Sequence, residues 1–571
     1  MVSINCFAPN ADEPQPNRAN RGWLFNREWA RIFANEKILA FIGVNSRLKM
    51  FAEKAQISLY SDLSFCHILL LLVKNLTNFL AVAKRKFYFF GEFRIRPRQH
   101  KWRDVRAFII IRRDSALKWF RRHVIRNPAR MLVISFILLI AAGTAGLMLP
   151  QSSAATPVRF IDALFTITSG SCVTGLAVFD IGTQLTRFGQ TVLLLSIQFG
   201  GLGILTLSTF FILIVGGSLS FRGHNLLQET FSQQPIADFG ALLKSIIAVT
   251  LSIEFIGAGL LYFRFSQLHS IGTAIYHSIF HSISAFCNAG FALYPDNLIR
   301  FQSDWYVNFI IGALIVLGGL GFVVYYDLGD FFLRRSRLPF AALSFHTRLT
   351  ILVTLILIVG GMVGFFLLEF DNILKPMNWP TKILVSLFQS ITPRTAGYNT
   401  VPFDQLTNGT LFFVIMLMFI GGSSGSCAGG IKTSTFAVLA SLAWARFRDQ
   451  YEVNLLRRRI PDSVLSKAVS VTFFAVLVIF FFTFVLLQSE IGSIAFQKTQ
   501  RHFIELLFET TSAFGTVGLS TGVTPGLTDV GKLAITLVMF LGRIGPLTVA
   551  IAVAKAVSRP YKYASETFLV G

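Results

Sequence analysis

The chain has 571 residues, of which 53% are hydrophobic and only 14% are charged, and its mean hydropathy is +0.60. Soluble domains carry about a quarter charged residues, so this composition excludes an ordinary soluble protein and predicts an integral membrane protein. The formal net charge of +23 comes largely from blocks of Lys and Arg beside apolar segments. Such blocks indicate retention in the cytosol by the positive-inside rule in preference to nucleic-acid binding.

Residues 1–127 form a basic N-terminal extension that we expect to be cytosolic or interfacial. Its most apolar stretch, "FCHILLLLVKNLTNFLAVAK" (65–84), is interrupted by Lys74, Asn75 and Asn78. These side chains are costly at the centre of a bilayer, so the stretch predicts an amphipathic interfacial helix rather than a crossing. The polar start "MVSINCFAPN" lacks the apolar core of a cleavable signal peptide.

From residue 128 onward the pattern predicts four tandem units, with boundaries at 128–235, 236–340, 341–460 and 461–571. Each unit starts with an apolar segment of about 20 residues, the length that crosses a bilayer as a helix. These first segments lie at about 131–150, 242–263, 350–368 and 469–487. A second apolar segment ends each unit, at about 188–216, 305–326, 410–442 and 530–554.

Between its two apolar segments, every unit carries the same short motif. The four copies are "LFTITSGSCVTGLAVFD" (164–180), "IFHSISAFCNAGFALYPD" (279–296), "LFQSITPRTAGYNTVPFD" (387–404) and "LFETTSAFGTVGLSTG" (507–522). Each runs from Phe through Ser and Thr to one glycine, over ten residues in three copies and nine in the third. The roughly dozen residues before each glycine are too short to cross, so we expect short helices that enter the membrane and return.

The predicted fold is therefore an all-α integral membrane protein of four helix–pore loop–helix units. Four units give eight crossings around a pseudo-fourfold axis, with both termini in the cytosol. Basic segments at 333–338 and 446–459 and around Lys555 mark the cytosolic side. The five cysteines are scattered and predict neither a disulfide framework nor a zinc site; they are Cys6, Cys66, Cys172, Cys287 and Cys427.

Four re-entrant loops around one axis indicate a cation pore. Backbone groups at membrane depth must be buried in protein or line water, and carbonyl oxygens turned inward can replace the hydration shell of an ion. Glycine suits the turn because it adopts left-handed backbone angles freely. The alternative is that these glycines only allow close helix packing, which we expect of Gly200, Gly201 and Gly203.

The span from about residue 128 to the end resembles the Trk/Ktr/HKT superfamily of potassium transporters, most closely the pore-forming, KtrB-like subunit. The motifs "SGSCVTGL", "CNAGF", "TAGYNT" and "GTVGLSTG" resemble its four filter loops in order and spacing. The resemblance implies K⁺ as the transported ion and Na⁺ as a candidate activator. In that family serine at the first filter glycine accompanies Na⁺ transport, so Gly175 implies K⁺. The alternative is a sodium or non-selective monovalent cation transporter of the same fold.

The resemblance also implies which residues line the filter and form the gate. The expected filter residues are Val173, Thr174, Gly175, Asn288, Ala289, Gly290, Thr395, Ala396, Gly397, Thr516, Val517 and Gly518. The stretch "IGGSSGSCAGGIKTST" (420–435) interrupts an apolar segment. It is not a phosphate-binding loop, because Ile431 separates Gly430 from Lys432. Its position resembles the family's intramembrane gate loop, 421–434; the gate residues are then Gly421, Gly422, Gly425, Gly429, Gly430 and Arg543.

Several other polar residues fall inside the apolar segments. Arg543 lies more than a dozen residues into the last segment, a depth at which ionisable groups usually face a cavity or pore. For Glu254, Glu505 and Glu509 we favour structural roles, although Glu509 is also a candidate to hold an ion at the mouth. His277 and His281 are four residues apart but lack further ligands at metal-binding spacing, so we expect packing and hydrogen bonding.

No nucleotide-binding fold, enzymatic constellation or cofactor is expected in this chain. The resemblance implies a homodimer that docks a separate cytosolic ring of nucleotide-binding, KtrA/TrkA-like subunits, with membrane lipid as the other partner and no nucleic acid. It places the protein in the plasma membrane of a bacterial cell. A secondary carrier with inverted repeats is a further alternative, but these four units run parallel to one another.

Overall fold

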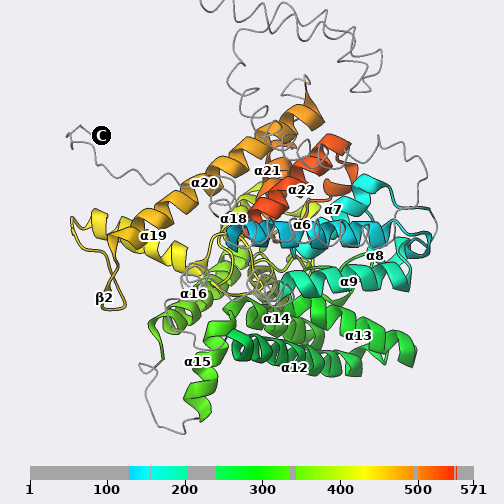
Figure 1. Ribbon diagram of the computed structural model, residues 1–571, viewed down its shortest axis with the longest axis horizontal. Helices are drawn as coiled ribbons and strands as arrows, with labels where there is room; N and C mark the ends of the chain where they lie inside the picture. Colours follow the sequence, from blue (N-terminus) through cyan, green and yellow to red (C-terminus); the bar gives the residue numbers. More distant parts are fainter. Residues whose placement is uncertain are drawn as a thin grey trace, which may run out of the picture. The chain divides into compact units, whose positions relative to one another are not determined.

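The computed structural model describes residues 128–154, 156–202, 239–333, 343–492 and 502–545, together with Thr499 and Thr548 (Figure 1). The expected N-terminal extension, the basic segment after Leu333 and the tail around Lys555 lie outside the described residues. The rest is helical, apart from one hairpin of β1 (Asn454–Leu455) and β2 (Arg458–Arg459). The chain is therefore a helical protein, as the sequence predicts.

Each unit contains a long helix, a short helix, an extended loop and a second helix. The long helices are α6 (Pro128–Leu147), α12 (Phe239–Phe265), α16 (Phe345–Glu369) and α20 (Asp462–Leu486). The short helices are α7 (Phe160–Ser171), α13 (Ile271–Phe286), α17 (Trp379–Ile391) and α21 (His502–Gly515). The second helices are α9 (Arg187–Gly201), α14 (Trp305–Leu320), α18 (Asn408–Phe419) and α22 (Asp529–Ile544). The short helices that the sequence predicts are thus present.

The smaller elements connect these helices. They are η3 (Pro150–Ser152), α8 (Ile181–Gln184), η4 (Ile299–Phe301), α15 (Phe322–Leu333), η6 (Phe403–Gln405), α19 (Thr433–Phe447), the π-helical η7 (Leu487–Ile491) and η9 (Thr524–Gly526). Among the described residues, four helices are long and apolar enough to cross a membrane, or five if the bent pair α14–α15 counts as one span. Large apolar side chains such as Phe255 (80% exposed) and Leu367 (69%) cover their outer faces, which suits contact with lipid. The chain is a membrane protein; eight crossings remain a prediction.

Each second helix begins with a side-chain cap. Thr186, Asp304, Thr407 and Thr528 each accept a hydrogen bond from a backbone N–H in the first turn of α9, α14, α18 and α22. Such caps satisfy donors that the helix itself leaves open. The same device at the same place in four units indicates that one local structure is repeated, and it fixes where each loop must end.

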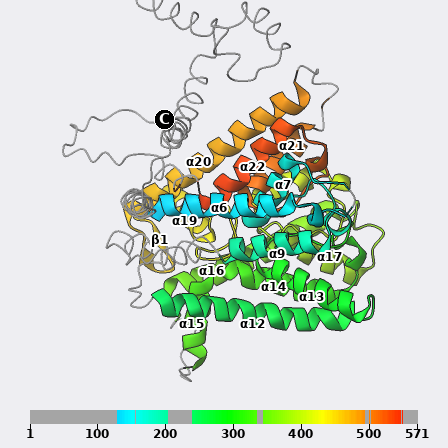
Figure 2. The ribbon, with the colours of Figure 1, turned by 45° about the vertical axis from the view of Figure 1, so that its right-hand side comes forward.

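The four units pack in a closed order. Within each unit the long helix packs on the short helix, as α20 and α21 do in Figure 2. Between units, the second helix packs on the short helix of the next unit: α9 on α13, α14 on α17, α18 on α21, and α22 back on α7. This cyclic order brings segments of the first and last units together.

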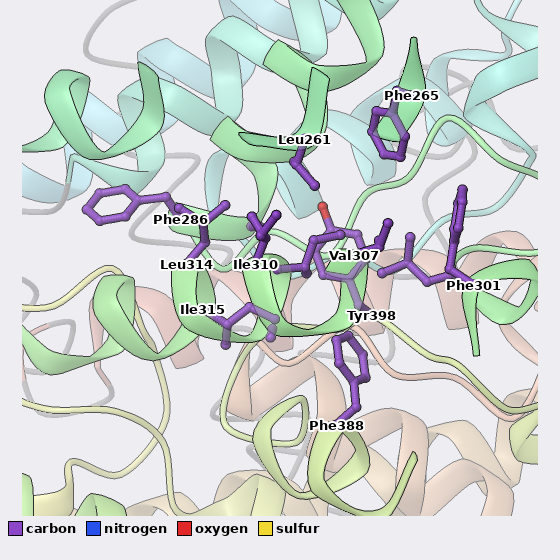
Figure 3. Close-up of a cluster of buried hydrophobic side chains, with 14 of the residues drawn as sticks. Leu261, Phe265, Phe286, Phe301, Val307, Ile310, Leu314, Ile315, Phe388 and Tyr398 are labelled. Carbon is purple, nitrogen blue, oxygen red and sulfur yellow. The ribbon is translucent and has the colours of Figure 1, made fainter. Parts of the chain in front are cut away.

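The core between the second and third units shows how tight this packing is. Phe388 from α17 and Tyr398 from the loop after it lie among Val307, Ile310 and Ile315 of α14 (Figure 3). Tyr398 is fully buried, and its hydroxyl donates to the carbonyl oxygen of Phe291 over 3.1 Å. A residue of the third loop therefore packs into the unit before it, so the loops are held from outside as well as by their own helices.

One interruption is not predicted by the sequence. We expect a single apolar segment over 305–326, and this prediction is wrong: α14 ends at Leu320, and α15 leaves it at 94°. Gly321 has φ +92°, which breaks the helix, and the N–H of Phe322 donates to the carbonyl oxygen of Gly425 over 3.1 Å. The bend is thus stabilised by a loop about a hundred residues away, which local apolarity cannot reveal.

Among the described residues, two ion pairs join the first and last units, and they differ in burial. Lys532 Nζ lies 2.7 Å from Asp162 Oδ1, with side chains 9% and 16% exposed. Arg159 and Asp529 pair over 2.7 Å nearby, but their side chains are 61% and 48% exposed. We expect Lys532→Met to destabilise the protein by about 3 kcal/mol, because it leaves a mostly buried carboxylate without its partner.

Arg159→Met is the matched control, and we expect it to change stability little because an exposed pair is well solvated. Thermal unfolding of the purified protein in detergent measures both. Equal losses of stability for the two variants would show that the buried pair does not hold the first and last units together.

Candidate functional site

The loops after the four short helices share one unusual backbone conformation. A non-glycine residue in the left-handed region follows each helix: Val173 (φ 56°), Asn288 (60°), Thr395 (70°) and Thr516 (51°). Two residues later comes a glycine with positive φ: Gly175 (100°), Gly290 (69°), Gly397 (76°) and Gly518 (92°). Left-handed angles cost non-glycine residues about 1–2 kcal/mol each. With left-handed residues at both ends of each loop, successive carbonyl groups point in directions that they would not take in an extended strand.

Hydroxyl groups from the last turn of each short helix brace these loops. Ser169 and Ser512 accept the backbone N–H of Gly175 and Gly518 over 3.0 and 3.1 Å. In the second loop Ser284 donates to the carbonyl oxygen of Phe291 over 2.9 Å. In the third, Thr392 donates to the carbonyl oxygen of Tyr398 over 2.5 Å. The Ser and Thr side chains of the repeated motif therefore stabilise the strained backbone of the loops through hydrogen bonds.

The third loop is one residue shorter, and the structure accommodates it locally. In the other three loops the residue before the glycine donates its N–H five residues back, for example from Thr174 to Ser169 over 2.7 Å. In the third loop Ala396 donates four residues back, to Thr392, over 3.0 Å. The third loop is thus shortened where it leaves α17, and Gly397 occupies the same position in its loop as the glycines of the other three loops.

Close approaches between the glycines connect the four loops in a ring. A β-carbon on Gly175 would lie 2.5 Å from the carbonyl oxygen of Ala289; one on Gly290, 2.6 Å from that of Ala396; and one on Gly397, 2.5 Å from that of Val517. A β-carbon on Gly518 would meet the carbonyl oxygen of Thr174, which closes the ring in chain order. A side chain at any of these four positions would force the neighbouring loop to shift. The twelve filter residues expected from sequence are therefore brought together.

The ring is rich in uncharged oxygen atoms. The carbonyl oxygens of Thr174, Ala289, Ala396 and Val517 face neighbouring loops at the glycines. In the described part of the chain, the hydroxyls of Thr174 and Thr516 are buried without a hydrogen-bond partner. Oxygen dipoles without a formal charge suit a monovalent ion, since they replace its hydration shell without binding it too tightly to leave.

The interrupted stretch 420–435 is a loop inside the protein. Helix α18 ends at Phe419 and α19 begins at Thr433, so the predicted break is present. The two ends of the loop are pinned together, because the N–H of Gly421 donates to the carbonyl oxygen of Ile431 over 2.8 Å. The loop between them then runs against the broken end of α14, where the N–H of Ser423 donates to Gly319 over 3.0 Å.

This loop also touches the fourth filter loop. A β-carbon on Gly429 would collide with the hydroxyl of Thr516, and one on Gly430 would lie 3.4 Å from the Cα of Gly515. Gly425 has φ +73° and nothing within 4 Å of a β-carbon. The glycines at 421, 422 and 429 thus allow close approach, whereas Gly425 and Gly430 (φ +61°) serve the turns of the loop.

Arg543 joins the loop to the first unit. Its guanidinium, 4% exposed, donates to the carbonyl oxygen of Cys427 and to that of Gly200, the latter over 2.5 Å. Its Nε is buried without a hydrogen-bond partner, and within the described residues no carboxylate pairs with it. Lys432, whose direction the sequence leaves open, bonds within the loop, from Nζ to the carbonyl oxygen of Ala428 over 2.7 Å.

The buried carboxylates hold protein groups. Glu509 of α21 accepts the hydroxyl of Ser520, the N–H of Thr521 over 3.2 Å and the hydroxyl of Thr524 over 2.9 Å. Glu254 of α12 accepts Gln198 Nε2 of α9 over 3.1 Å, which links the first two units. These contacts occupy the oxygens that an ion would need, in keeping with structural roles.

The histidine pair of α13 is likewise engaged with protein groups. His281 Nε2 accepts the N–H of Leu293 over 3.3 Å, so the other ring nitrogen, Nδ1, donates to the carbonyl oxygen of His277 over 2.7 Å. His281 also stacks on Tyr294 with ring centres 5.2 Å apart, and His277 meets the same tyrosine ring edge-on. The lone pair of His281 is therefore not free for a metal ion.

Sequence reasoning missed two buried or half-buried acids that hold the capping threonines of second helices. Glu369, at the end of α16, accepts the N–H and hydroxyl of Thr407, both over 3.0 Å. Glu490, in η7 after α20, does the same for Thr528 over 3.0 and 2.7 Å. The capping threonines could have been found from a Leu–Thr dipeptide that recurs in "QLTRF" (184–188), "QLTNG" (405–409) and "GLTDV" (526–530).

Comparisons with known proteins agree with this architecture. The family model for the cation transport protein TrkH matches residues 100–561. The Ktr system potassium uptake protein B of Bacillus subtilis is 40% identical over 79% of this chain and 98% of its own length. The potassium/sodium uptake protein NtpJ of Enterococcus hirae is 33% identical over 78% and 97%. The crystal structure of the potassium transporter TrkH from Vibrio parahaemolyticus aligns with a TM-score of 0.57 at 17% identity, over 74% of this chain and 83% of that one, a likeness of fold.

Proposed function

Since the chain belongs to the TrkH family of cation transport proteins, we propose that it takes up K⁺ through a filter built from the four loops. The observation that carries this proposal is the closed ring of glycines, each against a carbonyl oxygen of the next loop. The ion is the transported substrate, and the protein contributes main-chain oxygens and no catalytic side chain. The membrane potential supplies about 2.3 kcal/mol per charge for each 100 mV.

The filter residues of each loop have separate tasks in this proposal. The left-handed residue at the start of each loop and the glycine at its end set the direction of the carbonyls between them. The hydroxyls of Thr174 and Thr516 add oxygen atoms that no protein group uses, among the residues described. The short helices end at the loops, so the negative ends of their dipoles favour a cation there.

We assign the gate to the 421–434 loop and Arg543. The loop touches Thr516 of the filter and is fixed by the arginine to the first unit. An ion leaving the filter therefore meets a positive charge and a loop of small residues. The glycines of this loop give its backbone access to other conformations, so the loop can move while the helices around it stay folded.

The remaining assignments follow from family and composition. We propose eight crossings about a pseudo-fourfold axis, a plasma-membrane location in a bacterial cell and cytosolic termini. The working assembly is a homodimer with a cytosolic ring of nucleotide-binding regulatory subunits. Three relatives are named as components of a Ktr system, which supports a multi-component assembly. The chain carries no enzymatic activity in this proposal.

Sodium is the second candidate ion, because one relative is a potassium/sodium uptake protein. Expression in a cell that lacks its own K⁺ uptake distinguishes the two. We expect growth at low K⁺ and uptake of Rb⁺ as a K⁺ tracer, with weaker Na⁺ uptake. Robust Na⁺ uptake without K⁺ or Rb⁺ uptake would overturn the assigned substrate.

Gly175→Ser tests the selectivity of the first loop. The β-carbon would lie 2.5 Å from the carbonyl oxygen of Ala289, so the backbone at this corner of the ring must shift. We expect the ratio of K⁺ to Na⁺ uptake to fall about tenfold, since a displaced oxygen holds the larger ion less well. Uptake of the two ions, measured side by side in cells, gives the ratio; an unchanged ratio would show that this loop does not select.

A further inference from the structure

A cavity of about 750 Å³ lies in the second unit, outside the filter ring and the gate. It is formed by the end of α12, the start of α14 and parts of the chain between them. Its lining includes Arg264, His269, Tyr294, Arg300, Trp305 and Tyr306. Cavities of this size commonly hold a small molecule or one end of a larger one. Transport as proposed above uses none of these side chains.

The cavity lies where an apolar span ends. The candidate span of α12 is Lys244–Phe265, and the lining starts in the last turn of that helix. Trp305 and Tyr306 are 50% and 42% exposed, and such residues gather at the boundary between membrane and water. Phe263 and Phe309, within one turn of the lining in each helix, are 64% and 73% exposed. A lipid with its headgroup in the cavity therefore finds apolar side chains for its acyl chains.

Two guanidinium groups at the cavity keep N–H donors free. Arg264 donates from Nε to Asp304 over 2.6 Å and from Nη1 to Gln267 over 2.7 Å. Arg300 holds Asp296 through Nε over 2.8 Å and Nη2 over 2.7 Å. Among the described residues, none accepts a hydrogen bond from Nη2 of Arg264 or Nη1 of Arg300. Free guanidinium N–H groups are well suited to phosphate oxygens.

The fixed charges around the cavity balance one another. Asp304 neutralises Arg264, and Asp296 neutralises Arg300. The other oxygen of Asp304 caps α14, where it accepts the N–H of Tyr306 over 3.1 Å. A ligand with a net charge would bring an uncompensated charge to a partly buried site, which is costly. The charge balance therefore favours a ligand that carries one phosphate and one cationic group.

We propose that this cavity binds the headgroup of a zwitterionic phospholipid from the surrounding bilayer. The phosphate lies at Arg264 and Arg300, and the ammonium group lies against the rings of Trp305 and Tyr306, since aromatic faces attract such cations. The binding itself does not depend on the proposed function, but its effect on uptake does.

A bound headgroup acts on the second filter loop through Tyr294, which belongs to that loop and lines the cavity. The guanidinium of Arg300 lies 4.5 Å from the centre of the Tyr294 ring, and the Tyr294 hydroxyl lies 3.0 Å from His269 Nε2. The same ring stacks on His281, whose Nε2 accepts the N–H of Leu293 in the loop. A ligand that fixes Arg300 thus stabilises the loop, and we expect it to speed uptake.

The first experiment measures binding by native mass spectrometry of the full chain, freed of lipid and titrated with phosphatidylcholine, phosphatidylethanolamine or phosphatidylglycerol. We expect one bound zwitterionic lipid per chain in the wild type and at least about tenfold weaker binding in Arg300→Gln, which loses the charged donor. Arg300 belongs to a partly exposed ion pair, so its loss should cost little stability. Arg159→Gln is the matched control, because Arg159 forms a similar exposed pair that does not line the cavity.

The second experiment measures Rb⁺ uptake into proteoliposomes of phosphatidylglycerol, alone or mixed with phosphatidylcholine or phosphatidylethanolamine. We expect both mixtures to speed uptake about threefold for the wild type and Arg159→Gln, but not for Arg300→Gln, because a ligand shifts a population only where it binds. The surface charge of the vesicles acts on all three proteins alike. The two zwitterionic lipids differ in shape, so an equal effect of both assigns it to the headgroup charges.

Equal binding of phosphatidylcholine by the wild type and Arg300→Gln would overturn the proposal, as would phosphatidylglycerol that binds as tightly as phosphatidylcholine. Soluble glycerophosphocholine is the remaining arm: binding as tight as that of the lipid would assign the cavity to a soluble ligand and overturn the lipid. An equal response of uptake to lipid in Arg300→Gln and the wild type would refute the action on the filter loop. Absence of Rb⁺ uptake in every vesicle would instead refute the proposed function, and mass spectrometry would still decide the lipid site.

Discussion

Gly518→Ala is expected to abolish Rb⁺ uptake, whereas Gly522→Ala, four residues later, is expected to leave most of it. Both glycines have nearly the same backbone angle, φ +92° and +93°, so alanine pays a similar strain of about 1–2 kcal/mol at either position. Only Gly518 faces a neighbour: its β-carbon would meet the carbonyl oxygen of Thr174. Nothing lies within 4 Å of a β-carbon at Gly522. The difference between the variants therefore measures closure of the ring, and not backbone strain.

The measurement is the initial rate of Rb⁺ uptake per molecule in the membrane, with abundance determined by immunoblot. We expect a loss of at least about tenfold for Gly518→Ala and less than about twofold for Gly522→Ala, since one displaced loop disturbs the oxygens around the ion. Equal losses would assign the effect to left-handed strain. Normal uptake by Gly518→Ala would remove the fourth loop from the filter.

Arg543→Gln is expected to increase the maximal rate of Rb⁺ uptake about tenfold while leaving membrane insertion intact. The guanidinium bonds the carbonyl oxygens of Cys427 and Gly200 at once, which a glutamine amide cannot repeat. Each hydrogen bond to a charged group contributes about 1.5–3 kcal/mol, and about 1.4 kcal/mol changes a population tenfold. Loss of one such bond is thus enough to shift the loop strongly towards its displaced state, and loss of the charge lowers the barrier for the ion.

Lys432→Gln is the control for a lost positive charge near the same loop. Its ammonium bonds only within the loop, to Ala428, so we expect a smaller change in rate. Uptake by Arg543→Gln that equals the wild type would exclude Arg543 from the mechanism. Equal acceleration by both variants would show that the charge matters and that the anchoring to the first unit does not.

The parts predictable from sequence are those that recur. The four Phe-to-glycine motifs predict the short helices and the places of the four glycines, because the same local backbone is built four times. The break between Phe419 and Thr433 is readable because glycines and hydroxyls interrupt an apolar run. The chain's assignment to a cation transport family is confirmed by its relatives.

The parts that the sequence does not reveal depend on contacts between distant segments. The bend at Gly321 is stabilised by the gate loop, and no local apolar pattern separates Gly321 from glycines that merely pack. Glu369 and Glu490 are informative only once Thr407 and Thr528 are known to be helix caps.

The number of membrane crossings is predicted from the sequence but is not tested by the described helices. The second helices of the first and fourth units are described only as far as Gly201 and Ile544, and α14 and α18 are broken or short. By length and apolarity alone these helices do not qualify as membrane spans, although each lies at the same place in its unit. Eight crossings follow from the repeat and stay a prediction.

Locating the ion itself tests the central claim most directly. Crystals of the protein soaked with Tl⁺ or Rb⁺ give anomalous density at the positions that the ion occupies. We expect density within the ring, in contact with the carbonyl oxygens of Thr174, Ala289, Ala396 and Val517. Density only elsewhere in the protein, with none between the four loops, would contradict the account.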